Sequence, residues 1–208
     1  MNDFAEPVGT RRSPVKHTAI LRAATEVFLR EGYTRASVDT IAVAAGVGKQ
    51  TVYGHFGNKQ RLFLAVVDEA RQAAGVGPAA GNVVCTDAAD TRTNLEATGV
   101  RLLRAMLEPE NAALHRLTIA ELSHHPELIR GWRDEGSSDE LIDAIAKFLG
   151  SREELRVDNP SLSARQFVML LSAEGQVRSL RGVQPLSDQE IEQIARETTD
   201  LVLRAHRP

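Results

Sequence analysis

Residues 41–59 of the 208-residue chain read IAVAAGVGKQTVYGHFGNK, and this stretch is the most informative part of the sequence. Apolar residues at helical spacing run up to Gly46, a residue type that readily adopts the left-handed backbone with which many helices end. After the turn, Val52 and Phe56 are four residues apart, which places both on one face of a second short helix. The spacing predicts a helix–turn–helix over about residues 37–56.

The second helix of this motif, expected over Lys49–Phe56, is polar on the face that Val52 and Phe56 do not occupy. Within two turns it presents hydrogen-bonding side chains, at Lys49, Gln50, Thr51, Tyr53 and His55, with Lys59 just beyond. The expected core partners of its apolar face are Phe28, Ile41 and Leu62. A short helix that is anchored on one side and polar on the other is shaped to enter the major groove of DNA.

The flanking sequence completes a helical unit around the motif. Ser13 and Pro14 mark the start of a first helix. Serine is a common side-chain cap, and proline is favoured at the first helical position because the backbone N–H that it lacks would have no partner there. Gly32 is expected to end this helix. Ser37 is expected to cap the first helix of the motif, and Asn58 to cap a fourth helix that follows the motif.

A break at residues 75–81, which read GVGPAAG, separates this unit from the rest of the chain. Beyond it, the low aromatic content of 4% and the helical spacing of apolar residues favour further helices. These are expected over about residues 90–107, 110–123, 126–149, 160–180 and 188 onward. Ser137 and Glu140 have capping-box spacing, so the stretch 126–149 could be one helix or two. The predicted fold class is all-α, with about nine helices in two unequal groups.

The stretch 41–59 resembles the TetR-type (TetR/AcrR) family of transcriptional regulators, and the resemblance extends over about residues 14–74. Upstream, Ala23-Ala24 and Gly32-Tyr33 fit the same pattern. The resemblance implies a three-helix DNA-binding unit, joined by a fourth helix to a larger helical domain that binds small ligands and dimerises. The implied division is a flexible arm at 1–13, a DNA-binding domain at 14–74 and a regulatory and dimerisation domain at 75–208.

The resemblance makes Lys49–Phe56 the recognition helix. Gln50 and Thr51 are expected to read bases, since a glutamine amide can pair with both N6 and N7 of adenine. Gly54 lies where many relatives carry a bulky base-reading side chain, and Gly48 lies where they usually carry serine or threonine. The contacts expected on the phosphate backbone, where they fix register, are Ser37, Thr40, Tyr53, His55 and Lys59, with Lys49 in either role.

The resemblance also implies a partner subunit and an effector for residues 75–208. The last two helices would pair with those of a second copy, and the expected contacts are Phe167, Leu170, Leu171, Ile194 and Leu201. The effector would be a small molecule with an apolar part, and the residues expected to line its site are Met106, Trp132, Phe148 and Phe167. Each of these four also fits an ordinary core position.

Charge is divided unevenly along the chain. Taken whole, the net charge of −3 and the pI of about 6.1 argue mildly against nucleic acid as a partner. Residues 1–63, however, hold nine Lys or Arg against five Asp or Glu, a net charge of +4, whereas the remainder holds 16 against 23, a net charge of −7. Arg11 and Arg12 could reach a neighbouring groove as an arm or remain a solvated tail. The local charge favours double-stranded DNA as the partner.

Other function classes find little support in the sequence. The apolar runs are far shorter than the roughly 20 residues that cross a bilayer, so no membrane contact is expected. Because the N-terminus lacks the apolar stretch of an export signal and Cys85 is the single cysteine, a cytoplasmic location is expected. Gly48-Lys49 lacks the other residues of a phosphate-binding loop. His124-His125 fits a turn better than a metal site, so neither metal nor cofactor is expected.

An enzyme is not expected, because no nucleophile with a base, no carboxylate pair and no cofactor loop is recognisable. Two alternatives to a ligand-controlled regulator remain: a DNA-binding structural protein without ligand control and, with less support, a small helical enzyme. The size of the second domain argues against the structural protein, since more than half of the chain is not needed to hold DNA.

Overall fold

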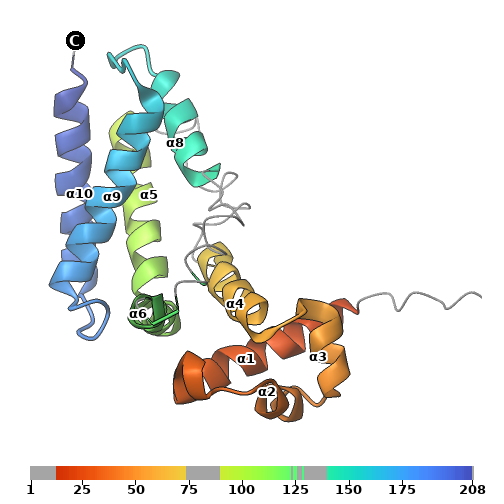
Figure 1. Ribbon diagram of the computed structural model, residues 1–208. Helices are drawn as coiled ribbons and strands as arrows, with labels where there is room; N and C mark the ends of the chain where they lie inside the picture. Colours follow the sequence, from red (N-terminus) through yellow and green to blue (C-terminus); the bar gives the residue numbers. More distant parts are fainter. Residues whose placement is uncertain (1–12, 74–89, 123, 126–127, 129–139, 208) are drawn as a thin grey trace, which may run out of the picture. The chain divides into compact units, whose positions relative to one another are not determined.

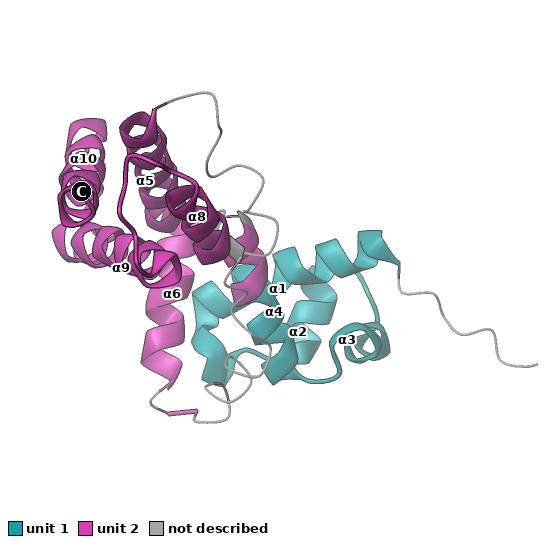
Figure 2. Ribbon diagram, turned by 90° about the horizontal axis from the view of Figure 1, so that it is seen from above, with its two compact units in different colours: residues 1–66 teal, residues 67–208 magenta. Residues whose placement is uncertain are grey.

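The computed structural model of the chain describes residues 13–73, 90–122, 124, 125, 128 and 140–207, and these residues form nine α-helices and no strand (Figure 1). The all-α fold class is confirmed. Contacts divide the chain into two compact units, residues 1–66 and 67–208 (Figure 2). The expected break at 75–81 lies outside the described residues, and the division falls inside α4 (Lys59–Ala73).

The first unit consists of α1 (Pro14–Arg35), α2 (Val38–Ala44), α3 (Lys49–Phe56) and the beginning of α4. The expected span of the recognition helix is confirmed. Gly32 interrupts α1 with a φ of 76°, as predicted, but helical backbone resumes after it as far as Arg35.

Side-chain caps begin two of these helices. The backbone N–H of Thr40 donates to Oγ of Ser37 at 3.0 Å, and that of Arg61 donates to Oδ1 of Asn58 at 2.8 Å, so both predicted caps are confirmed. The predicted side-chain cap at Ser13 is wrong, because its hydroxyl makes no cap hydrogen bond. The start of α1 therefore depends on the proline that follows.

Aromatic rings form the centre of the first unit. The rings of Phe28 and Phe63 meet edge to face with their centroids 5.1 Å apart, and Tyr33 lies 5.0 Å from Phe63. Val52 and Phe56 are buried, as are the partners predicted for them, Phe28, Ile41 and Leu62. The apolar face of α3 is thus fixed in the core, which leaves its other face outward.

The described helices of the second unit, beyond α4, are α5 (Thr91–Leu107), α6 (Pro109–Leu122), α8 (Glu140–Gly150), α9 (Pro160–Arg178) and α10 (Asp188–Ala205). Helices α5, α9 and α10 pack on one another, and α8 packs on α9. Whether residues 126–149 form one helix or two lies largely outside the described residues.

Capping residues again account for where helices of the second unit begin. Oδ1 of Asp90 accepts from the backbone N–H of Thr93, and Oδ1 of Asn159 accepts from that of Leu162. Ser187 and Glu190 form the reciprocal capping box that their spacing predicts. The hydrogen bond from Ser187 lowers the pKa of the Glu190 carboxyl, which keeps the box intact at neutral pH.

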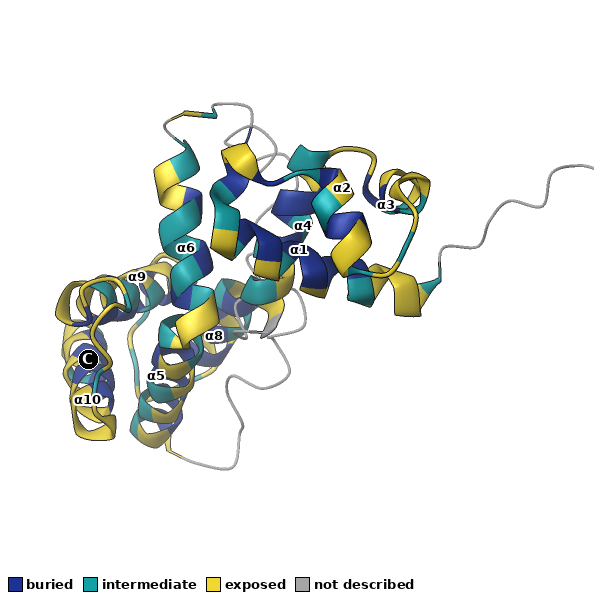
Figure 3. Ribbon diagram, turned by 90° about the horizontal axis from the view of Figure 1, so that it is seen from below, coloured by how far each residue is buried: buried dark blue, intermediate teal, exposed yellow. Residues whose placement is uncertain are grey.

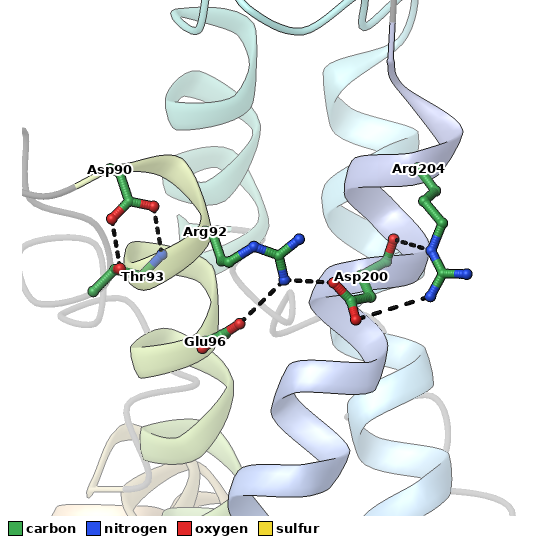
Figure 4. Close-up of polar contacts among 6 residues, drawn as sticks. All are labelled: Asp90, Arg92, Thr93, Glu96, Asp200 and Arg204. Carbon is green, nitrogen blue, oxygen red and sulfur yellow. Dashed lines mark hydrogen bonds and ion pairs between the residues drawn. The ribbon is translucent and has the colours of Figure 1, made fainter.

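A polar network on the surface joins α5 to α10 (Figure 4). The guanidinium of Arg92, on α5, donates to the carboxylates of Glu96 and Asp200, and Arg204 also contacts Asp200. The hydrogen bond from Arg92 lowers the pKa of Asp200. Because these side chains are partly exposed, the network aligns the two helices more than it stabilises the fold.

Candidate nucleic-acid interface

Backbone geometry shapes the turn between α2 and α3. Gly46 has a φ of 66°, and the N–H of Val47 donates to the carbonyl of Ala42 at 3.0 Å. Gly48 stands at the N-cap of α3 and offers no side-chain cap, but the N–H of Thr51 donates to its carbonyl at 2.8 Å. The turn therefore sets the direction of α3 without a hydroxyl at position 48.

The polar face of α3 is open to solvent (Figure 3). Lys49, Gln50, Tyr53 and Gly54 are exposed, and Thr51 is half-buried. A Cβ built at Gly54 would meet no atom within 4 Å, so this face has free space beside the exposed side chains. The residues expected to read bases thus lie where a partner can reach them.

Lys49 has a carboxylate partner that the sequence did not suggest. Its Nζ lies 2.9 Å from Oδ2 of Asp39 on α2, and both side chains are exposed. The hydrogen bond from Lys49 to Asp39 raises the pKa of the ammonium group. A DNA phosphate that bound Lys49 would have to compete with this carboxylate for the ammonium group.

Ser37 and Thr40 contact each other at the N-terminus of α2. Their hydroxyl oxygens are 2.8 Å apart, and Ser37 also accepts from the backbone of Thr40. Both side chains are half-buried. These two residues therefore cap the start of α2. A phosphate contact would have to use the donor or acceptor positions of the two hydroxyls that these hydrogen bonds leave open.

Lys59 is engaged inside the first unit. Its Nζ donates to the carbonyls of Tyr33, Thr34 and Ala36 at 2.9, 3.3 and 3.2 Å, and it lies 4.6 Å from the centroid of the Tyr33 ring. An ammonium group has three donors. The side chain thus ties α4 to the end of α1 and to the residue that follows it, a structural role that differs from the expected phosphate contact.

His55 faces α1 as well as solvent. Its ring centroid is 5.8 Å from that of His17, and the His17 ring stacks on Phe56 at 4.8 Å. His17 carries no signal in the sequence, because a lone histidine near the start of a helix belongs to no motif. The two histidines place imidazole groups at the end of α3 beside the start of α1.

The residues expected to line an effector site are only partly brought together. Met106 lines a cavity of about 250 Å³ in the second unit. Phe148 and Phe167 do not line this cavity and are buried among the apolar residues of the core, the position that the sequence also allowed for them. Trp132 lies outside the described residues. The polar lining of the cavity includes His115, Gln176 and Arg181, which the sequence analysis missed.

The residues expected at a subunit contact also divide in two. Phe167, Leu171 and Ile194 are at most 1% exposed and belong to the core of their own chain, so they have no surface to offer a partner and this prediction is corrected. Leu170 and Leu201 are 38% and 53% exposed. The sequence shows that these positions are apolar, but helical spacing does not show which neighbours cover them.

The described residues include no helix long and apolar enough to cross a membrane, and no group of three or more His, Cys, Asp or Glu that could hold a metal ion. Near the His124-His125 pair, Nε2 of His125 is 3.6 Å from Oε2 of Glu121. Glu121 lies one helical turn before His125, so the spacing of the two residues in the sequence already indicated this contact.

A short helix with a solvent-facing polar side, anchored in a small helical unit after a tight glycine turn, defines a helix–turn–helix protein that binds DNA. Two family models match the chain. The one described as "Bacterial regulatory proteins, tetR family" matches residues 20–66, and the one described as "AefR-like transcriptional repressor, C-terminal domain" matches residues 93–208. The chain belongs to the TetR family of transcriptional regulators.

Individual relatives agree with this family. The HTH-type transcriptional regulator TcmR of Streptomyces glaucescens is 29% identical over 177 residues, which are 82% of this chain and 75% of that protein. A TetR-family regulator from Mesorhizobium loti is 28% identical, with a TM-score of 0.77 over 96% of this chain and 100% of that one. The flavonoid-responsive regulator FrrA is 27% identical, with a TM-score of 0.74 over 94% and 99%. The chain is a DNA-binding transcriptional regulator and not an enzyme.

Proposed function

We propose that the chain is a repressor that binds a palindromic operator as a homodimer and releases it when a small molecule binds the second unit. The observation that carries the proposal is the solvent-facing polar side of α3, whose opposite side is fixed in the core by Val52 and Phe56. Repression would follow from occlusion of the promoter. Because its target is chromosomal DNA, the protein would act in the cytoplasm.

In this proposal α3 lies in the major groove. Gln50 and Thr51 read bases: the amide of Gln50 is exposed, and a glutamine amide can make a bidentate contact with adenine. The phosphate backbone is contacted by Tyr53, His55, Ser37 and Thr40. Lys49 contacts either the backbone or a base. Lys59 is left out of these contacts, because its three donors are directed at carbonyl groups of its own chain.

Exposed apolar side chains along α9 support a second copy of the chain as partner. Leu162, Met169, Leu170 and Val177 are between 38% and 72% exposed, although they lie on a helix whose other face is buried. On α10, Leu201 is 53% exposed. Exposed apolar side chains repeated along these two helices fit a symmetric helix pairing. A dimer would present two recognition helices to half-sites about 34–36 Å apart or slightly more.

Control by a small molecule is the remaining part of the proposal. The cavity in the second unit offers space for one, and the similar regulator FrrA is described as flavonoid-responsive. A ligand releases DNA only to the extent that it binds the DNA-free arrangement of the dimer more tightly than the DNA-bound one. The chain would therefore couple the two sites through its dimer.

The proposal is tested by selecting bound sequences from random double-stranded DNA with the full chain. We expect a palindromic consensus whose half-site spacing matches a dimer. Binding without any consensus would favour the alternative of a structural DNA-binding protein. Sedimentation at micromolar concentration provides a second test, since a strictly monomeric chain contradicts the dimer.

Gln50→Ala is expected to relax the preference of the protein at one operator position. If the amide makes a bidentate base contact, its loss weakens binding to the preferred sequence by about 1–3 kcal/mol and leaves other sequences nearly unaffected. Fluorescence anisotropy with the selected operator and with its single-position variants measures both quantities. Gln189→Ala removes an exposed amide from the first turn of α10 and serves as the control. Equal weakening on every sequence would contradict base reading by Gln50.

Lys59→Met keeps the aliphatic stem of the side chain and removes its ammonium group. We expect the free energy of unfolding of the first unit to fall by about 1.5–3 kcal/mol, the range for hydrogen bonds made by a charged group. Urea denaturation measures this change, with the exposed Lys16→Met as control. The salt dependence of DNA binding should keep its slope; a slope lower by about one would instead assign Lys59 to a phosphate.

A further inference from the structure

The cavity of the second unit is apolar over most of its wall. Leu102, Met106 and Leu107 line it from α5, Leu114 from α6 and Val168 from α9. Its volume of about 250 Å³ is slightly below the usual range for small-molecule sites, which favours a compact ligand. The size and apolar lining of the cavity therefore indicate a ligand with a compact apolar body. The polar side chains of the wall indicate which polar group such a ligand carries.

Several polar side chains of the wall are already committed to nearby groups of their own unit. The hydroxyl of Thr118 donates to the carbonyl of Leu114, that of Ser172 donates to the carbonyl of Val168, and the amide of Asn111 donates to the carbonyl of Ala105. Their donors satisfy helix backbone and are not directed at the cavity. The remaining polar groups therefore decide which ligand chemistry the cavity accepts.

Three of the remaining groups form a connected cluster: His115 on α6, Gln176 on α9, and Arg181 in the turn after α9. Nη1 of Arg181 donates to Oε1 of Gln176 at 3.2 Å, and Gln176 also hydrogen-bonds His115. Burial and the nearby charges of Arg181 and Arg116 lower the pKa of His115, against the effect of Gln176, so its imidazole is neutral at pH 7. The cluster thus offers a guanidinium, an amide and a neutral imidazole.

The turn that carries Arg181 has an unusual backbone. Leu180 and Arg181 have φ values of 49° and 59°, a left-handed conformation that costs energy for residues with a Cβ. The turn is fixed on α6, because Nη1 of Arg116 donates to the carbonyl of Arg181 at 2.7 Å. Strained backbone that the surrounding structure holds in place is common at ligand sites. Here it keeps the Arg181 guanidinium at the cavity wall.

The charges around this end of the cavity have one sign. Arg71 and Arg181 belong to the wall, and among the described residues that line it none is an aspartate or glutamate. Within the described part of the chain, no carboxylate forms an ion pair with Arg116 or Arg181 either. Arg181 therefore has no carboxylate partner within the described part of the chain, and the anionic group of a ligand could form charge-assisted hydrogen bonds with its exposed guanidinium.

We propose that the cavity binds a compact apolar monoanion, a carboxylate or phenolate on an apolar body, with its anionic group held by Arg181 and Gln176. The proposal rests on the proposed function for its biological meaning, since it names the chemical class of the effector. The apolar body lies against the leucine and methionine side chains, and His115 completes the polar end. A cation of the same shape would be repelled by the guanidinium of Arg181.

Isothermal titration calorimetry with the full chain tests the ligand class without DNA. The probes are two matched pairs, 2-naphthoate with 2-naphthamide and octanoate with octanamide; the members of each pair share their apolar body and nearly their shape, and only the acid is charged. We expect at least one acid to bind about tenfold to a hundredfold more tightly than its amide, the range for a charge-assisted hydrogen bond. An amide that binds as tightly as its acid would overturn the proposal. So would a failure of both acids to bind with a Kd below about 1 mM.

Arg181→Gln tests the anchor. We expect this variant to lose the preference for the acid and to keep its affinity for the amide, which also verifies that the cavity is intact. Arg165→Gln removes an exposed arginine from α9 and should change neither affinity. Gln176→Leu provides a second variant and should reduce the same preference. A preference for the acid that persists in Arg181→Gln would overturn the assignment of Arg181.

A separate measurement of operator release by the same acid distinguishes this inference from the proposed function. If the acid binds in calorimetry but leaves the anisotropy of the operator complex unchanged, the ligand class stands and ligand-controlled release fails. If another class of molecule releases the operator while the acids do not bind, release stands and the ligand class is wrong.

Discussion

Replacing Phe28 with alanine is expected to lower the free energy of unfolding of the first unit by about 3–5 kcal/mol, the usual cost of truncating a buried aromatic side chain. The ring is fully buried and contacts Phe63 edge to face. Alanine would leave a cavity and remove this aromatic pair, together with the packing on Tyr33. Because small domains are stable by only about 5–15 kcal/mol, operator binding should be largely lost at 37 °C.

Thermal and urea denaturation followed by circular dichroism measure this loss, and anisotropy measures the operator. Val43→Ala is the matched control, since Val43 is 82% exposed on α2 of the same unit and its truncation should cost less than about 0.5 kcal/mol. Phe28→Ala should still bind the acid probe, because the cavity is lined by the second unit. Full operator binding by a variant with an unchanged unfolding midpoint would show that Phe28 is not central to the core.

The helix–turn–helix was predictable because its signals are local. Ser37 caps α2 through the residue three positions on, Gly46 ends the helix with its own backbone, and the spacing of Val52 and Phe56 fixes which face of α3 is buried. Each of these effects depends on neighbours within a few residues. The sequence could therefore specify the recognition helix to the residue.

The contacts that the sequence did not predict join positions distant along the chain. Lys59 reaches carbonyls more than 20 residues earlier, and Asp39 pairs with a lysine on the next helix. Charged side chains with several possible partners have no periodicity that would single out one of them. The reading of Lys59 as a phosphate contact relied on its position after α3, whereas its long flexible stem lets the ammonium turn back into the unit.

Apolar residues of the second unit illustrate a different limit. The run from Phe167 to Leu171 is apolar throughout, which favours burial on more than one side of α9. Periodicity does not show whether the covering surface belongs to the same chain or to another. The core takes Phe167 and Leu171, whereas Leu170 remains exposed. The polar cluster of the cavity could not be predicted from the sequence either, because His115 and Arg181 come from distant segments that share no sequence pattern.

The close approach of the turn after α9 to α6 leads to the second large expected effect, that of Gly182→Ala. Gly182 has a φ of 77°, and a Cβ at this position would lie 2.3 Å from Cβ of Ala112 on α6. Both the left-handed backbone and the overlap oppose a side chain, and together they should cost about 2–5 kcal/mol. Relief of the overlap requires the turn to move away from α6, which carries Arg181 away from His115. The preference for the acid probe should then disappear along with the stability.

Gly46→Ala separates these two contributions. Gly46 has a similar φ of 66°, but a Cβ there would meet nothing within 4 Å, so only the backbone cost of about 1–2 kcal/mol applies. Urea denaturation of both variants compares the two costs, and calorimetry compares their affinities for the acid. If Gly182→Ala costs no more than Gly46→Ala and keeps its preference for the acid, the turn is not held against α6 as described. A larger cost with loss of that preference would tie the strained turn to ligand recognition, since the same close contact that stabilises the unit would also position its anion-binding arginine.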